Sequence, residues 1–262
     1  MGPDEREVTH STPYPCMWCG SRADSREHAI PKWMSKRLNL KVFMGSRSSR
    51  GVRRARHSIS FASYRKRIFC GPCNTHFHHL EDEAIPLLEP MAWGRRAISL
   101  DGASQELLAL WAAKTGMALM AASGLTNLLP QSHRDAVRYA AKPPGDCWVG
   151  YFNWTGEPNI WVGDSQVGAI GPTPPAGGKA YKAIFSFRRA GFMLAGFINP
   201  IPDGFRIGSR PEHPFLQVWP VQPGLVHWPP PHKAANETAI GDLVQYAPTL
   251  PANYRSTGRR IA

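Results

Sequence analysis

The sequence predicts an α+β protein in three parts: a cysteine- and histidine-rich unit, a helical segment, and a C-terminal antiparallel β-rich domain. Two cysteine pairs, Cys16-Met-Trp-Cys19 and Cys70-Gly-Pro-Cys73, mark the first part. Apolar residues at helical spacing mark the second part, and short aromatic and β-branched runs between turn residues mark the third. With 262 residues, of which 42% are hydrophobic, the chain is long enough to bury a core.

Changes in composition place the boundaries of these parts. We expect a loosely held lead-in at 1–15, the cysteine-rich unit at 16–95, the helical segment at 96–142, the β-rich domain, of unknown role, at 143–225, and a Pro/Arg-rich irregular arm at 226–262.

The two cysteine pairs predict a structural zinc site. A CxxC turn can point two thiolates at one ion, and two such turns complete the tetrahedral shell that zinc prefers. We therefore expect Zn²⁺ at Cys16, Cys19, Cys70 and Cys73, with no position left open for water. The alternative, a reduced redox motif, lacks the thioredoxin-like sequence around it. The fifth cysteine, Cys147, lies in an apolar run and is expected to be a buried, inert thiol.

The helical segment contains two predicted helices. Residues from 107 to 119 place apolar side chains on one face, with Asp101 or Ser104 as the N-cap. Lys114 lies within that helix and is expected to extend its amine to solvent rather than act as a nucleophile. A second helix begins after Pro130, where Ser132 and Asp135 have the spacing of a capping box.

The β-rich domain is predicted to contain strands near 147–153, 158–163, 180–188, 191–198 and 214–220, with a hairpin around 189–191. We find no catalytic pattern here. The histidines of this half of the chain lack a cysteine or carboxylate at ligand spacing; they are His133, His213, His227 and His232.

The charge distribution predicts a polyanionic partner. The formal net charge is +12, and between His28 and Leu80 the chain carries twelve Lys or Arg residues and no Asp or Glu. The polar N-terminus lacks the pattern of a secretory signal, and the apolar stretch from Leu107 is too short to span a membrane. We expect a cytoplasmic protein that has no membrane partner.

The segment that follows the first cysteine pair carries an acid and a histidine, in Arg26-Glu27-His28-Ala29-Ile30-Pro31, and the second pair is followed by Asn74. Over about residues 14–85 this arrangement resembles the HNH endonuclease family. The resemblance implies a ββα-metal module, encoded by a bacterium or phage, in which a hairpin and a helix enclose a catalytic Mg²⁺ or Mn²⁺. It implies hydrolysis of DNA, with His28 as the general base and Glu27 and Asn74 as metal ligands.

Some details of this assignment stay open. His78 lies one helical turn after Asn74 and is either a further ligand or a packed surface residue, whereas His76 and His79 point elsewhere. Glu81 is expected to support the site or to bind an Arg. Glu27 stands where Asp is commoner, which allows direct or water-mediated binding. Only Asn39 is available as the family's middle Asn, and the partner that orients His28 stays unassigned.

The basic stretch supplies candidate phosphate contacts, and its serines could add further donors. DNA is the expected partner and RNA is not excluded; the residues are Lys32, Arg47, Arg50, Arg53, Arg54, Arg56, Arg65, Lys66 and Arg67. The alternative for this stretch is a solvated basic loop. Two further alternatives are a non-catalytic zinc-containing module that binds nucleic acid, and a main activity carried by residues 100–262.

Overall fold

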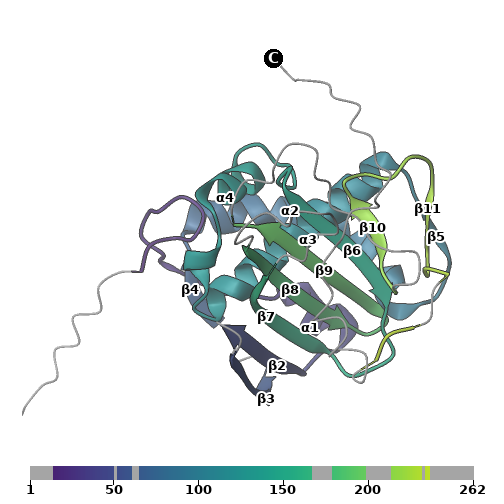
Figure 1. Cartoon of the computed structure of the whole chain (residues 1–262), viewed down its shortest axis with the longest axis horizontal. Helices are drawn as coiled ribbons and strands as arrows, with labels where there is room; N and C mark the ends of the chain where they lie inside the picture. Colours follow the sequence, from purple (N-terminus) through teal and green to yellow (C-terminus); the bar gives the residue numbers. More distant parts are fainter. Residues whose placement is uncertain are drawn as a thin grey trace, which may run out of the picture.

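A seven-stranded mixed sheet, with helices on one face, organises the structure (Figure 1). The computed structural model describes residues 14–49, 52–60, 65–166, 179–198, 214–231 and 234–236. In order across the sheet the strands are β10 (Leu216–Trp219), β6 (Cys147–Asn153), β9 (Ala190–Phe197), β8 (Lys179–Phe187), β7 (Asn159–Gln166), β2 (Val42–Ser49) and β3 (Val52–Ser60).

The strands from the C-terminal half agree with the sequence prediction, and their alternation builds two buried faces. On β6, Val149 and Tyr151 belong to the core beneath the helices, whereas Trp148 and Phe152 belong to a second aromatic cluster. Strands β8 and β9 form the expected hairpin, in which Phe187 pairs with Ala190 around a two-residue turn.

The strands from the C-terminal half are antiparallel to one another as predicted, but the whole sheet is mixed because β2 joins β7 in parallel. The polar segments 42–49 and 52–60 were expected to be part of a basic stretch without predicted strands. They extend the C-terminal sheet instead, since β7 offers them an unpaired strand edge. Strands from the predicted cysteine-rich unit and strands from the predicted β-rich domain thus share one sheet.

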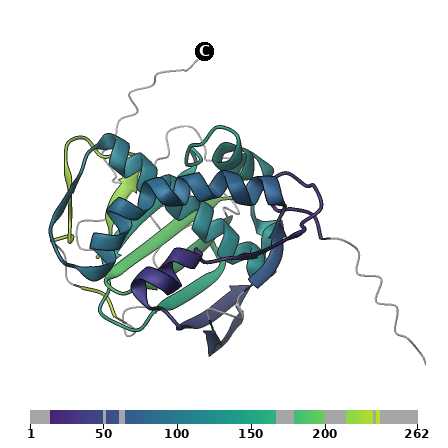
Figure 2. The same ribbon diagram turned by 180° about the vertical axis from the view of Figure 1, so that it is seen from behind.

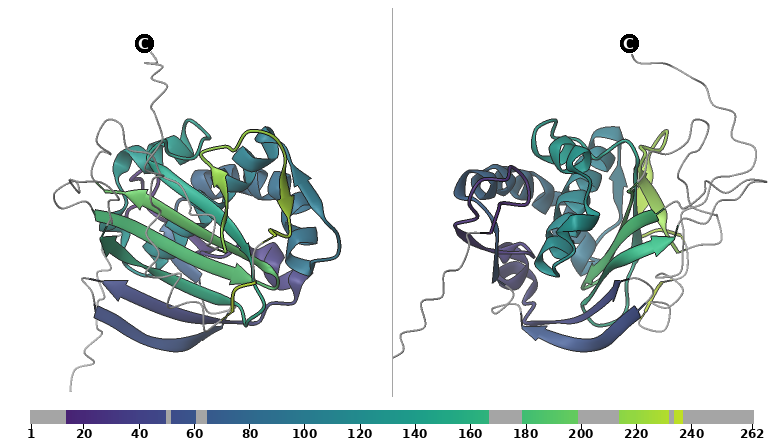
Figure 3. Two further views of the ribbon diagram at one scale, coloured as in Figure 1. Left: turned by 45° about the vertical axis from the view of Figure 1, so that its right-hand side comes forward. Right: turned by 60° about the vertical axis from the view of Figure 1, so that its left-hand side comes forward.

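The helices are α1 (Lys32–Leu38), α2 (Gly71–Trp93), α3 (Gly102–Ala122) and α4 (Gln131–Arg138), with a 3-10 turn η1 (Thr126–Leu128). Viewed from behind, they cover one face of the sheet (Figure 2), and the two layers separate clearly in the right-hand view of Figure 3. None of the helices within the described ranges has both the length and the apolar character of a membrane span.

The caps of α3 and α4 differ in how well the sequence predicted them. Asp101 caps α3 as expected, because its carboxylate accepts a hydrogen bond from the Ser104 amide at 2.8 Å. The capping box predicted at Ser132 is wrong. Pro130 is the N-cap of α4, and Asp135 accepts a hydrogen bond from the Gln131 side chain at 2.7 Å instead.

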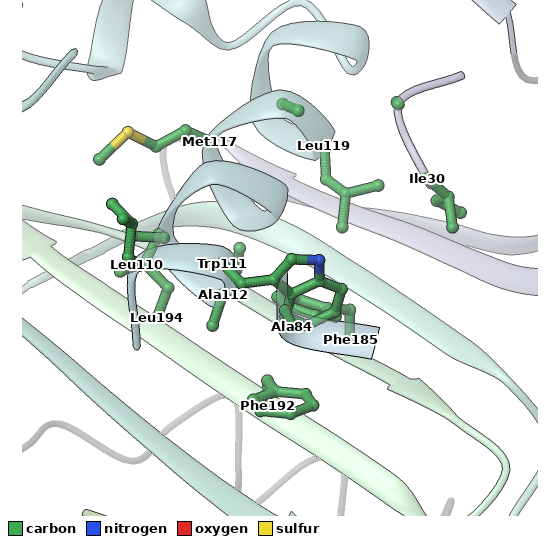
Figure 4. Packing of buried hydrophobic residues seen from close by; sticks show 14 of the residues in the cluster. Ile30, Ala84, Leu110, Trp111, Ala112, Met117, Leu119, Phe185, Phe192 and Leu194 are labelled. Atoms are coloured by element: carbon green, nitrogen blue, oxygen red, sulfur yellow. The ribbon is translucent and has the colours of Figure 1, made fainter. Parts of the chain in front are cut away.

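Helix α3 packs directly on the middle of the sheet (Figure 4). Trp111 is fully buried, and its ring lies edge-on to Phe185 and Phe192, at centroid distances of 5.9 and 5.4 Å. Gly116 permits the close approach, because a Cβ there would lie 2.9 Å from Leu194 Cδ2 and 3.1 Å from Ala183 Cβ. The helix is therefore buried on nearly all sides.

A buried ion pair joins α3 to α2. Lys114 was expected to reach solvent, but its side chain is 2% exposed and its amine pairs with Glu81 of α2. The amine also lies 5.8 Å from the centre of the Phe69 ring and 5.7 Å from that of Phe77. Glu81 thus fixes its helix to a lysine rather than to the arginine that the sequence suggested.

Two small antiparallel sheets complete the described fold. Strand β1 (Ser25–His28) pairs with β4 (Arg65–Phe69), and β5 (Ile98–Leu100) pairs with β11 (Val226–Trp228). The predicted irregular arm therefore begins with a paired strand. Most of the predicted lead-in and the arm beyond residue 236 lie outside the described residues.

Candidate metal centre

The four cysteines of the two CxxC pairs meet in one cluster, as the sequence predicted. Their sulfur atoms lie within 4.8 Å of one another, and the sulfurs of Cys19 and Cys70 are 3.5 Å apart. Gly20 closes the first turn with a φ of 75°, a conformation that suits glycine. The Met17 amide binds the Ile68 carbonyl at 2.9 Å, which fastens this turn to β4. The cluster is compatible with structural zinc.

Two arginines of α4 contact the cysteine cluster. Arg138 Nε donates to Cys73 Sγ at 3.2 Å, and Arg134 donates to the Met17 carbonyl at 2.7 Å. Burial opposes ionisation of Cys19, but hydrogen bonds, foremost those from Ser21, outweigh it and lower the pKa of this thiol to about 6. One ligand of the cluster is therefore readily available as a thiolate.

Strands β1 and β4 and helix α2 lie together beside this cluster, but α1, β2 and β3 separate the two strands along the chain, so β1 and β4 are not the hairpin that the HNH resemblance implies. In the β1–β4 pair, Ser25 lies opposite Phe69 and His28 opposite Arg65. Strand β4 then leads through Cys70 into α2. The Asp24 carboxylate accepts a hydrogen bond from the Gly71 amide at 2.9 Å, so the beginnings of β1 and α2 lie side by side.

The predicted catalytic residues are distributed over this unit. Glu27 and His28 are the last two residues of β1, and their side chains lie outside the described residues. Asn74 lies in the first turn of α2, partly exposed, and His78 follows one turn later and is exposed. Asn39 ends α1 in the left-handed conformation.

The neighbouring histidines of α2 have different surroundings. His76 is half-buried and lies edge-on to Phe77, at a ring-centroid distance of 5.0 Å. Burial lowers the pKa of His76, and the charges of Arg138 and His79 lower it further. His79 is exposed like His78, so it provides a natural control for substitutions on this helix.

The predicted nucleic-acid contacts lie on α1 and on strands β2, β3 and β4. Lys32, Lys66 and Arg67 are exposed. In the β2–β3 pair the backbones of Arg47 and Arg54 lie opposite each other. The structure does not describe Arg50. It describes the backbone but not the side chains of Arg47, Arg53, Arg54, Arg56 and Arg65.

The structure contains a second group of side chains of metal-ligand type, which was not predicted from the sequence. His133, Asp146 and Cys147 place ligand atoms within 4.8 Å of one another, so the prediction that His133 lacks such partners is wrong. Tyr181 completes the group, with its hydroxyl 2.8 Å from His133 Nδ1. No spacing rule could have found it, because α4 and β8 approach each other only in the folded chain.

The chain matches no family model, no curated protein and no solved structure. The chemistry of its side chains and their arrangement must therefore carry any functional conclusion.

Proposed function

We propose that this protein is a metal-dependent endonuclease of the HNH type that hydrolyses phosphodiester bonds in DNA. The observation that supports this most directly is the unit of β1, β4 and α2, attached to a cluster of four cysteines. An antiparallel strand pair followed by a helix is what the HNH resemblance implies, although here α1, β2 and β3 lie between the two strands along the chain. The unit carries Glu27 and His28 on one strand and Asn74 at the start of the helix.

The cysteine cluster has a structural role in this proposal. Zinc bound by Cys16, Cys19, Cys70 and Cys73 would join the turn before β1 to the beginning of α2. These two segments are separated by fifty residues between Cys19 and Cys70, so an ion that links them fixes the position of the helix against the strand pair.

His28 is proposed as the general base that takes a proton from the attacking water. A neutral imidazole is suited to this near pH 7. Glu27 and Asn74 are proposed to hold the catalytic ion, with His78 as a further candidate ligand. Asn74 and His78 are accessible to a solvated ion, since Asn74 is partly exposed and His78 is exposed. When bound, Mg²⁺ or Mn²⁺ stabilises the charge that develops on the phosphate oxygens.

The basic residues around the unit support a polyanionic substrate. Lys66 and Arg67 are exposed on β4, directly before the second cysteine pair, and Lys32 is exposed at the start of α1. Contacts of this kind neutralise phosphates and supply affinity without sequence preference. In this proposal Lys66 and Arg67 would bind phosphates close to the catalytic residues, since Lys66 pairs with Glu27 across the two strands.

The test is cleavage of supercoiled plasmid in the presence of Mg²⁺ or Mn²⁺. Wild-type protein should yield nicked or linear DNA, and His28→Ala should lose this activity, typically by 10²-fold or more, while it retains its zinc. His78→Ala can be compared with His79→Ala, which changes a neighbouring exposed histidine. Loss in the former alone would identify His78 as a ligand.

A non-catalytic zinc module that binds nucleic acid is the competing function. It predicts that wild-type protein and His28→Ala bind DNA equally and that neither cleaves it. Full cleavage by a zinc-loaded His28→Ala variant would remove the proposed mechanism.

A further inference from the structure

The second cluster joins three parts of the fold. His133 comes from α4, Asp146 and Cys147 from the entry to β6, and Tyr181 from β8. The side chains of His133, Cys147 and Tyr181 are almost completely buried, with residue exposures of 2%, 0% and 0%. This concentration of ligand-type side chains lies in the core between α4 and the sheet, separate from the four-cysteine cluster.

Asp146 fixes the orientation of the imidazole. Its Oδ1 lies 2.7 Å from His133 Nε2, so the Nε2 hydrogen points at the carboxylate. In the neutral ring, the lone pair is then on Nδ1, which faces Cys147 and Tyr181. Histidines that bind metals almost always have their second nitrogen bound to a carboxylate or carbonyl in this way.

The three candidate ligand atoms, one each from His133, Cys147 and Tyr181, have separations close to those of neighbouring atoms in a metal coordination shell. Nδ1 is 3.6 Å from Cys147 Sγ, that sulfur is 3.2 Å from the Tyr181 oxygen, and the oxygen is 2.8 Å from Nδ1. Zinc bond lengths at the tetrahedral angle place neighbouring ligand atoms about 3.3–3.6 Å apart. The distance between nitrogen and oxygen would have to lengthen by about 0.5 Å, and that between sulfur and oxygen by about 0.3 Å.

We propose that His133 Nδ1, Cys147 Sγ and Tyr181 Oη form a second metal site, suited to Zn²⁺, whose imidazole is oriented by Asp146. Binding releases the thiol proton of Cys147 to solvent, and the thiolate offsets the charge of the ion. The bound ion links α4 to β6 and β8. Since α4 also contacts the first cluster through Arg134 and Arg138, this helix lies between two metal sites.

A hydrogen-bonded chain without metal is the competing explanation. The Cys147 thiol can donate to the Tyr181 oxygen, the phenol to His133 Nδ1, and Nε2 to Asp146. Cys147→Ser distinguishes the two explanations, because the new hydroxyl preserves the donor of this hydrogen-bonded chain but replaces the thiolate that the metal site needs.

The experiment measures tightly bound zinc per chain, after loading and exhaustive dialysis, by elemental analysis with protein concentration from amino-acid analysis. Cys147→Ser should bind one equivalent less than wild-type protein and retain native near-UV circular dichroism. Equal zinc content in the two proteins would overturn the proposal.

Cys16→Ser combined with Cys19→Ser provides an independent measurement that does not require the Cys147 variant to fold. It removes one CxxC pair and leaves only two thiolates in the first cluster, so one equivalent of zinc should remain, at the second site, and adding Cys147→Ser should remove it. If the Cys16→Ser/Cys19→Ser variant retains no zinc while its circular dichroism stays native, the second site does not exist. Both measurements are independent of nuclease activity.

Discussion

Replacing Lys114 with methionine should destabilise the protein strongly, although the two side chains have similar length. The Lys114 side chain is 2% exposed and that of Glu81 is 12% exposed, so the substitution leaves a nearly buried carboxylate without its cation. Removal of one partner from a buried pair typically costs about 3–5 kcal/mol. The amine also faces the rings of Phe69 and Phe77, which adds a favourable contact that methionine only partly replaces.

The matching double variant separates the charge from the packing. Glu81→Leu combined with Lys114→Met replaces the pair with apolar side chains of similar volume, and such replacements are often neutral or stabilising. The double variant should therefore be more stable than either single variant. The coupling free energy from the four proteins should exceed about 2 kcal/mol.

Urea unfolding at saturating zinc, followed by tryptophan fluorescence, measures these differences. With an m-value of about 3 kcal/mol/M, the midpoint for Lys114→Met should fall by roughly 1 M or more. The reasoning is refuted if Lys114→Met and Glu81→Leu each cost less than about 1 kcal/mol, or if their effects simply add.

Three further outcomes follow from single contacts. Gly116→Val should cost about 1–3 kcal/mol in urea unfolding, because its Cβ meets Leu194, whereas unchanged stability would contradict the close approach of α3 to the sheet. The Asp101 carboxylate accepts a hydrogen bond from the Ser104 amide, which lowers the carboxyl pKa. The cap therefore stabilises the protein above the unfolded pKa, and this stabilisation is lost as the pH falls through the folded pKa. The difference in thermal midpoint between wild type and Asp101→Asn should decline with acidification, and a constant difference would contradict this. Arg138→Leu removes the donor to Cys73, and zinc affinity in a chelator competition should fall about 10- to 100-fold, where an unchanged affinity would show that the contact is dispensable.

Short-range patterns predicted the elements whose signals are local. The strand at 147–153 and the hairpin near 189 follow from aromatic and β-branched runs bounded by turn residues, and the cap of α3 follows from Asp101. The capping box at Ser132 failed because α4 begins at Gln131 with Pro130 as its N-cap, two positions before the predicted cap. Local spacing alone cannot decide between neighbouring start positions.

Contacts between distant segments were not predictable in the same way. Strands β2 and β3 are rich in Ser and Arg, and what makes them strands is the edge of β7, which lies more than a hundred residues further along the chain. The environment of Lys114 was misjudged because a helical periodicity shows which residues share a face, but not that a second helix will supply Glu81 opposite it.

The sequence by itself determined the members of the four-cysteine cluster, because each CxxC turn sets the local geometry of its own two sulfurs. It also determined the basic character of the segment between those turns. Only the tertiary structure decided that α4 contacts this centre through Arg138 and that His133 meets Cys147 and Tyr181 in the core. Those contacts depend on the packing of a helix against a sheet, and side chains far apart in sequence carry no local sign of where such packing will place them.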